Sequence, residues 1–301
     1  MKLNFSTLFI SFLLLTTPGY SQTADDFFDS GITKHNIEDY NGAIADYNIT
    51  IEMNPKSADA YYARGIAKIN LRDFRGAIAD YNAAINLNPK SADAYYSRGI
   101  AKVHLGDFKG AIADYNQALE INPRFADAYY ARGIAKSHFK EFRGPIADYT
   151  MAIAINPKNA GFYYARGYAK ILNEDYGGAI ADYTRAIAIN PGYADAYYDR
   201  GIAKIHFEDY RGAIADYDMT IKMNPKTDDA YYARGNAKKH LEDYGGAIAD
   251  YDMTIKLNPN SAEAYYARSM ARLIFGQQDG ASLDFSKAGE LVDGKPDKAI
   301  K

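Results

Sequence analysis

The sequence predicts an all-α protein, an α-solenoid of about eight helix–turn–helix repeats. The first observation is a series of prolines, each 34 residues after the one before it: Pro55, Pro89, Pro123, Pro157, Pro191, Pro225 and Pro259. The second is that the eleven residues ADAYYARGIAK occur at 58–68 and, unchanged, at 126–136. A fixed period of this size outweighs the one or two large domains that 301 residues alone would suggest.

Residues 1–21 lie outside the period and are typical of a secretory signal peptide. A positive charge precedes the apolar run 8–15, and small residues at Gly19 and Ser21 favour cleavage before Gln22. The apolar run is shorter than the roughly 20 residues of a membrane span, although an uncleaved anchor is the alternative. We therefore expect an exported protein, periplasmic or secreted, with no membrane insertion after signal cleavage.

The composition excludes several classes of function. The chain has no cysteine, which excludes a disulfide framework, a thiolate metal site and a cysteine nucleophile. The formal net charge is −3 and no basic block occurs, so a nucleic-acid partner is not expected. Stability must then come from packing, which a helical array can supply.

Each repeat is taken to begin three residues before its first aromatic residue. The repeats are 24–57, 58–91, 92–125, 126–159, 160–193, 194–227, 228–261 and a degenerate copy at 262–293, followed by a C-terminal tail, 294–301. The degenerate copy lacks the glycine, the mid-repeat aromatic and the proline of the others, so we interpret it as a solvent-facing cap.

Local signals place the helix ends in each repeat. In the second repeat, Ser57 and Asp73 are predicted to cap the two helices, and Asn88, which precedes a proline, ends the second one. In the fourth repeat, Pro145 replaces an alanine, and proline is tolerated only in the first turn of a helix. The second helix of that repeat should therefore begin near Arg143.

A glycine recurs inside the first helix of seven repeats, at a cost of about 1 kcal/mol relative to alanine. This cost indicates a close approach between helices, and we expect Ala77 and its equivalents on the second helix to be the opposite surface. The glycines are Gly31, Gly65, Gly99, Gly133, Gly167, Gly201 and Gly235.

This pattern resembles the tetratricopeptide repeat: an aromatic residue at repeat position 4, glycine at 8, alanine at 20, an aromatic residue at 24, alanine or threonine at 27 and proline at 32. The resemblance covers residues 24 to about 293. It implies a right-handed superhelix of helical hairpins whose first helices line a concave groove, and a function in protein–protein interaction. The chain departs from the family at positions 7 and 11, where cations such as Arg64 and Lys68 replace large apolar residues.

These cations predict a ladder of salt bridges. Positions 7 and 11 are one helical turn apart, so both can face the aspartate of the second helix, which is Asp80 in the second repeat. We count the first-turn acids, such as Asp59, as further partners. The ladder would fix the register of packing, and a functional charge array is the alternative.

The resemblance places positions 2, 5, 9, 12 and 13 on the groove, and these spacings form one face of a helix. Tyrosine recurs at position 5, and it offers a large rigid ring with one polar group. The predicted peptide-binding residues are Tyr62, Tyr96, Tyr130, Tyr164, Tyr168, Tyr198, Tyr232, His104, His138, His206 and His240. The alternative is that these rings only pack between repeats.

We expect no metal, no cofactor and no catalytic activity. Neighbouring helices lie about 8–10 Å apart and zinc–nitrogen bonds are about 2 Å long, so one histidine per repeat cannot enclose an ion. No nucleophile–base arrangement and no glycine-rich phosphate loop stands out. The predicted function is a non-catalytic scaffold that binds an extended peptide or partner protein, with the contact surface in repeats four to seven. The alternative is a structural, self-associating homo-oligomer of the cell envelope.

Overall fold

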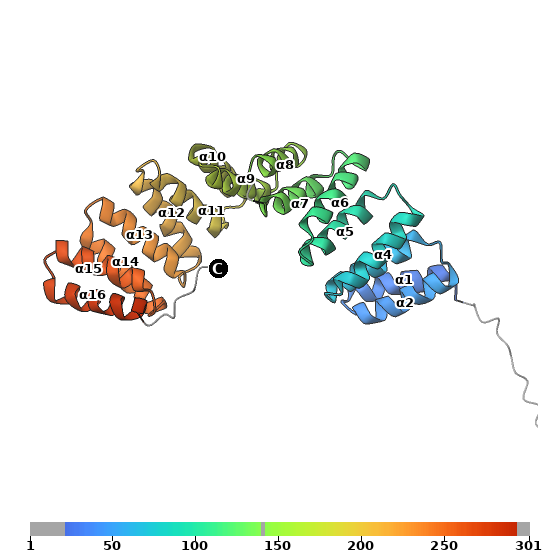
Figure 1. Ribbon diagram of the computed structural model, residues 1–301, viewed down its shortest axis with the longest axis horizontal. Helices are drawn as coiled ribbons and strands as arrows, with labels where there is room; N and C mark the ends of the chain where they lie inside the picture. Colours follow the sequence, from blue (N-terminus) through green and yellow to red (C-terminus); the bar gives the residue numbers. More distant parts are fainter. Residues whose placement is uncertain (1–21, 140–141, 294–301) are drawn as a thin grey trace, which may run out of the picture. The chain divides into compact units, whose positions relative to one another are not determined.

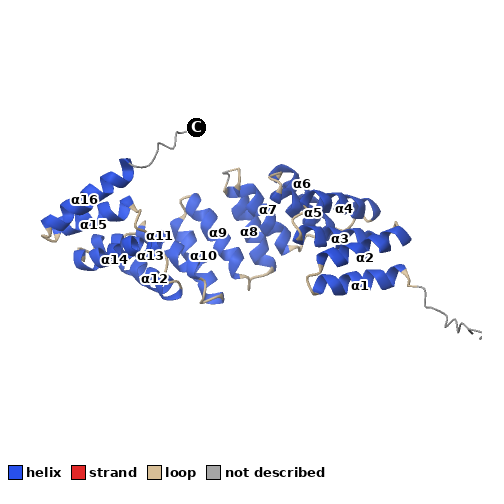
Figure 2. Ribbon diagram, turned by 90° about the horizontal axis from the view of Figure 1, so that it is seen from below, coloured by secondary structure: helices blue, strands red, loops and turns tan. Residues whose placement is uncertain are grey.

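The computed structural model describes residues 22–139 and 142–293. Within these ranges it contains sixteen helices and no strand (Figures 1 and 2). The predicted signal peptide and the predicted C-terminal tail lie outside the described residues. None of the described helices combines the length and the apolar character needed to cross a bilayer.

The helices alternate between the first and second helix of each repeat. They are α1 (Ala24–Asn36), α2 (Tyr40–Met53), α3 (Ala58–Asn70), α4 (Phe74–Leu87), α5 (Ala92–His104), α6 (Phe108–Ile121), α7 (Ala126–Ser137), α8 (Arg143–Ile155), α9 (Ala160–Leu172), α10 (Tyr176–Ile189), α11 (Ala194–Ile205), α12 (Tyr210–Met223), α13 (Asp228–His240), α14 (Tyr244–Leu257), α15 (Ala262–Ile274) and α16 (Gln278–Asp293).

The chain divides into two compact segments, a first segment with α1 to α5 and a second segment with α6 to α16. In each segment a helix packs against the next helix in the chain, so each is a stack of helical hairpins (Figure 1). This confirms the predicted all-α solenoid. First helices of consecutive repeats also approach one another: α1 and α3, α3 and α5, α9 and α11, α11 and α13, and α13 and α15.

The predicted helix ends are confirmed. The side chain of Ser57 accepts a hydrogen bond from the backbone N–H of Ala60, and Asp73 does the same for α4. Between the two helices Arg72 has a left-handed backbone with φ of 60°, which makes the turn. Helix α4 ends at Leu87, before Asn88. Helix α8 begins at Arg143, so Pro145 lies in its first turn, as predicted.

The core consists of alanines and one tyrosine per repeat. In the second repeat, Ala60, Ala67, Ala77 and the ring of Tyr81 are almost fully buried. The predicted close approach at the glycine is confirmed, because a Cβ added to Gly65 would lie only 2.6 Å from Cε1 of Tyr81. The predicted opposite surface was wrong, since the ring of Tyr81 faces the glycine, whereas Ala77 packs in a cluster with the next repeat.

The salt-bridge ladder is confirmed, with a different third partner. Asp80 binds Arg64 at 2.6 Å and Lys68 at 2.7 Å, and it is almost fully buried. The remaining nitrogen of Arg64, Nη1, donates to Asn48 in the preceding repeat at 2.6 Å. The third partner of the ladder therefore comes from the neighbouring repeat and is not a first-turn acid such as Asp59, so that part of the prediction was wrong. The ladder joins the two helices of a repeat and also fastens consecutive repeats.

The same arrangement recurs along the second segment. The aspartates that bind two cations there are Asp148, Asp182, Asp216, Asp250 and Asp284. Each arginine of the ladder also lies over the ring of the residue at position 4, as Arg64 does over Tyr61 with 5.4 Å between the guanidinium carbon and the ring centroid. Repetition of one geometry explains the uniform spacing of the sequence.

The last repeat exposes large apolar side chains. Leu283 is 73% exposed, and Phe285 and Val292 are each 61% exposed on α16. The position that holds a buried tyrosine in the other repeats is Phe285 here. Within the described residues, the end of the second segment therefore presents an apolar surface.

Candidate functional site

Consecutive first helices carry a row of pockets. We call the surface formed by positions 2, 5, 9, 12 and 13 of the first helices the first-helix face. Three of the pockets in the described chain lie on this face, each between two neighbouring first helices. They lie between α1 and α3, between α7 and α9, and between α11 and α13.

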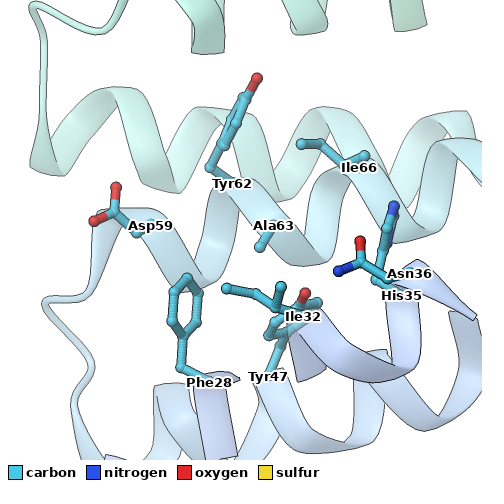
Figure 3. Close-up of a pocket in the computed structure, with 9 residues that line it drawn as sticks. All are labelled: Phe28, Ile32, His35, Asn36, Tyr47, Asp59, Tyr62, Ala63 and Ile66. Carbon is cyan, nitrogen blue, oxygen red and sulfur yellow. The ribbon is translucent and has the colours of Figure 1, made fainter. Parts of the chain in front are cut away.

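The pocket between α1 and α3 has a volume of about 350 Å³. It is lined by Phe28, Ile32, His35, Asn36, Tyr47, Asp59, Tyr62, Ala63 and Ile66 (Figure 3). Asp59 lies at one end and His35 with Asn36 at the other, while aromatic and aliphatic side chains lie between them. The pocket thus has an apolar middle with an acid at one end and polar groups at the other.

The two pockets of the second segment have the same construction and are smaller, at about 230 and 220 Å³. The pocket between α7 and α9 is lined by Tyr130, Ile134, Ser137, Tyr149, Tyr164, Ala165, Tyr168 and Ala169. The pocket between α11 and α13 is lined by Ile202, Ile205, His206, Tyr217, Ala233, Asn236, Ala237 and His240. Six residues of the predicted site therefore line pockets on one face: Tyr62, Tyr130, Tyr164, Tyr168, His206 and His240.

The position-5 tyrosines of the predicted site are half-buried, and five of them pack on the buried tyrosine of their own repeat. The ring centroids of Tyr62 and Tyr81 are 5.8 Å apart. The equivalent pairs are Tyr130–Tyr149, Tyr164–Tyr183, Tyr198–Tyr217 and Tyr232–Tyr251. Tyr96 occupies the equivalent place in α5. These rings therefore both pack in the repeat and present one side to the first-helix face.

The four histidines of the predicted site have a packing function that the sequence did not reveal. Each of these four is exposed and stacks on the first aromatic residue of the second helix in the preceding repeat. The centroid distances are 4.4 Å for His104–Phe74, 3.8 Å for His138–Phe108, 3.7 Å for His206–Tyr176 and 4.6 Å for His240–Tyr210. Over the described ranges, no group of three or more histidine or acidic side chains is placed to hold a metal ion.

Between α9 and α11 the first-helix face carries a buried polar group. Asp199 occupies position 6, where five other repeats have alanine, and its Oδ2 accepts a hydrogen bond of 2.8 Å from the hydroxyl of Tyr164. Burial raises the pKa of Asp199, although the bond from Tyr164 opposes this. Burial also raises the pKa of Tyr164, and the negative charge of Asp199 adds to the effect. The sequence analysis missed Asp199; comparing the repeats at position 6 would have found it.

An equivalent contact, between position 5 of one repeat and position 6 of the next, occurs in the first segment. There the hydroxyl of Tyr62 lies 3.3 Å from Oγ of Ser97, which is again a residue at position 6 of the next repeat. A polar residue at position 6 thus pairs with the position-5 tyrosine of the repeat before it. At Asp199 this polar residue is a carboxylate; Asp29 is the other acidic residue at position 6.

Family comparisons agree with the repeat pattern. Models described as tetratricopeptide repeat match residues 63–135 and 198–262, and one described as TPR repeat matches 170–204. Together they cover more than half of the chain. The chain belongs to the tetratricopeptide repeat family. No curated protein matches it significantly.

Solved structures of tetratricopeptide repeat proteins share its fold. The C-terminal part of a TPR repeat-containing protein from Cytophaga hutchinsonii matches with a TM-score of 0.68 and 18% identity, covering 80% of this chain and 98% of that one. MamA matches with a TM-score of 0.55 and 26% identity, over 58% and 96% of the two chains. YrrB, described as a TPR protein with an unusual peptide-binding site, matches at 0.58 and 21%, over 62% and 97%. Family and fold are those of protein–protein interaction scaffolds, which are typically non-catalytic.

Proposed function

We propose that the protein is an exported, non-catalytic scaffold that holds an extended peptide, or an extended segment of a partner protein, along the first-helix face. The observation that carries the proposal is the row of pockets between first helices, each bordered by a tyrosine or histidine of the predicted site. Export rests on the sequence of residues 1–21.

The chemistry of the pockets suits peptide side chains. Each has about 220 to 350 Å³ of space, which is the size of one or two amino-acid side chains rather than of a folded domain. Tyrosine supplies a large contact area at a small cost in conformational entropy, and its hydroxyl can bond to a peptide backbone. The rings are held by packing on the buried tyrosines, so the surface is formed before a ligand binds.

Affinity capture tests the proposal. The bait is the mature chain, residues 22–301, presented to envelope and secreted fractions of the source. The site variant changes Tyr62, Tyr130 and Tyr232 to alanine and leaves the α9–α11 region intact. The matched control changes exposed side chains of second helices, Met151→Ala and Arg185→Ala.

Circular dichroism first verifies that both variants are folded. A partner that the wild type and the control retain, and that the tyrosine variant loses, supports binding on the first-helix face. Equal capture by all three proteins overturns the proposed location of the site.

Self-association is a second candidate function, favoured by the apolar end of the second segment. Leu283, Phe285 and Val292 are exposed together on α16, and a pocket of about 420 Å³ lies beside them. Sedimentation velocity over a range of concentrations tests this function. Assembly that is abolished by Leu283→Gln supports it, and a concentration-independent monomer excludes it.

A further inference from the structure

The region between α9 and α11 places a carboxylate against the hydroxyl of a position-5 tyrosine. We call Tyr164, Tyr168, Tyr183 and Asp199 the α9–α11 site. Tyr164 and Asp199 are half-buried and joined by a hydrogen bond, and Tyr168 is 52% exposed beside them on the first-helix face. Tyr183 is fully buried on α10. Burial raises the pKa of its hydroxyl, and the nearby Asp199 and Tyr168 raise it further.

The negative charge of Asp199 has no cation to balance it within the described chain. The cations of the two helices are already used: Arg166 and Lys170 of α9 bind Asp182. On α11, Arg200 and Lys204 bind Asp216. The charged group that acts on Asp199 is Asp195, also of α11, and its charge has the same sign as that of Asp199. A half-buried carboxylate without a counter-ion is an unusual and costly element of a scaffold.

The hydroxyl of Tyr183 is a second, independent observation. It is buried and has no hydrogen-bond partner. Two equivalent tyrosines have a partner in their own repeat: Tyr251 donates to Asn236 at 2.8 Å, and Tyr149 lies 3.5 Å from Ser137. In this repeat those partner positions hold Tyr168 and Ile171, and neither bonds to the hydroxyl, so a second uncompensated polar group lies near Asp199.

We propose that the α9–α11 site binds a basic side chain, lysine or arginine, of the peptide held on the first-helix face. The cation pairs with the carboxylate of Asp199 and lies against the rings of Tyr164 and Tyr168, since aromatic faces attract cations. This inference rests on the proposed function and adds the chemistry of the partner.

The position of the neighbouring pocket adds a spacing. The pocket between α7 and α9 is apolar and shares Tyr164 and Tyr168 with the site. First helices of consecutive repeats are about 8–10 Å apart, and an extended chain rises about 3.3 Å per residue. The basic residue of the partner should therefore lie about three residues from an apolar residue that fills this pocket.

Selection from a phage-displayed library of random peptides tests the inference. The wild-type chain should select peptides with a lysine or arginine about three residues from an apolar residue. Asp199→Asn and Asp199→Ala should lose this preference; alanine is the residue that most other repeats have here, so the fold tolerates it. Glu52→Gln, an exposed acid on the second helix α2, changes the net charge equally and is the control.

Fluorescence polarisation with one selected peptide supplies the magnitude. Replacing its basic residue with norleucine should weaken binding to the wild type about tenfold or more, and binding to Asp199→Asn hardly at all. Wild-type affinity should also fall on acidification, because Asp199, whose pKa is raised by burial, then becomes protonated.

The outcomes separate the inference from the proposed function. Peptides that need Tyr62, Tyr130 and Tyr232 but show no basic preference leave the proposed function standing and overturn this inference. An equal loss of affinity in Glu52→Gln and Asp199→Asn also overturns it, because the effect is then one of net charge. If no peptide is selected at all, both fail.

Discussion

Replacing Gly235 with alanine should destabilise the protein, although alanine favours a helix over glycine by about 1 kcal/mol. The added Cβ would lie 2.8 Å from Cε1 of Tyr251 and 3.1 Å from its Cδ1, whereas carbon atoms in contact are about 3.5–4.0 Å apart. The ring of Tyr251 is fully buried, and its hydroxyl donates to Asn236, so the ring cannot withdraw without losing packing and that bond.

The magnitude follows from three contributions. Overpacking of this kind costs about 1–3 kcal/mol, and a hydrogen bond that is stretched or lost costs about 1 kcal/mol. The gain in helix propensity offsets about 1 kcal/mol. The free energy of unfolding should therefore fall by about 1–3 kcal/mol in Gly235→Ala.

Gly245→Ala is the matched control, because it lies in the same repeat and in the first turn of α14. Its added Cβ would lie 3.8 Å from Cζ and 4.0 Å from Cε2 of Phe275, which are ordinary contacts. This variant should be unchanged or more stable by up to about 1 kcal/mol. Urea unfolding followed by circular dichroism compares the two, with equal slopes required for the comparison. Equal stabilisation by both substitutions would refute the argument that the glycine exists to admit the tyrosine ring.

Three further predictions concern the ladder, the α9–α11 site and the N-terminus. Asp216→Ala leaves Arg200 and Lys204 partly buried without their carboxylate, and it should lower the free energy of unfolding in urea by about 3–5 kcal/mol. Asp218→Ala removes an exposed carboxylate and should lower it by at most about 1 kcal/mol. Similar costs for the two variants would contradict the ladder's role. Because the pKa of Asp199 in the folded chain is raised above its ordinary 3.8, folded protein binds the proton more tightly than unfolded protein, and stability falls as the pH rises through that window. Asp199→Asn should therefore melt at a higher temperature than the wild type at neutral pH, and at the same temperature below about pH 3.8. Equal melting temperatures at neutral pH would contradict a destabilising charge at Asp199. Mass spectrometry of the exported protein should find Gln22 as the first residue, and a retained Met1 would contradict cleavage there.

The helix ends could be predicted from sequence because they depend on contacts over three or four residues. Ser57 bonds to Ala60, and Pro145 restricts the turn in which it lies, so both carry their information locally. The pairing of Arg64 with Asp80 was also accessible, since helical periodicity places both cations of a repeat on one side.

Contacts between repeats were not accessible in the same way. Asn48 completes the ladder from the preceding repeat, and the face of Gly65 is covered by a ring rather than by Ala77, because the direction of the Tyr81 side chain depends on how the two helices cross. The positions of the first-helix face followed from the resemblance to the family, whereas the pockets depend on the gaps between helices. The apolar side chains exposed on α16 were not predicted, because missing motif residues do not show what is exposed.

The repeated and the unrepeated contacts have different consequences for function. The ladder and the glycine–tyrosine contact recur in the same form, so they would position any partner equally and cannot select one. Selection must come from residues that break the period on the first-helix face, and Asp199 is the one that places an unbalanced charge there.

Such a charge should leave a combined signature in two measurements on one variant. If Asp199 has no part in binding, Asp199→Asn gains stability and binds the basic peptide as tightly as the wild type does. If it serves recognition, the same substitution stabilises the fold and weakens the binding of a basic peptide, because the cost of the buried charge is recovered only when a cation arrives.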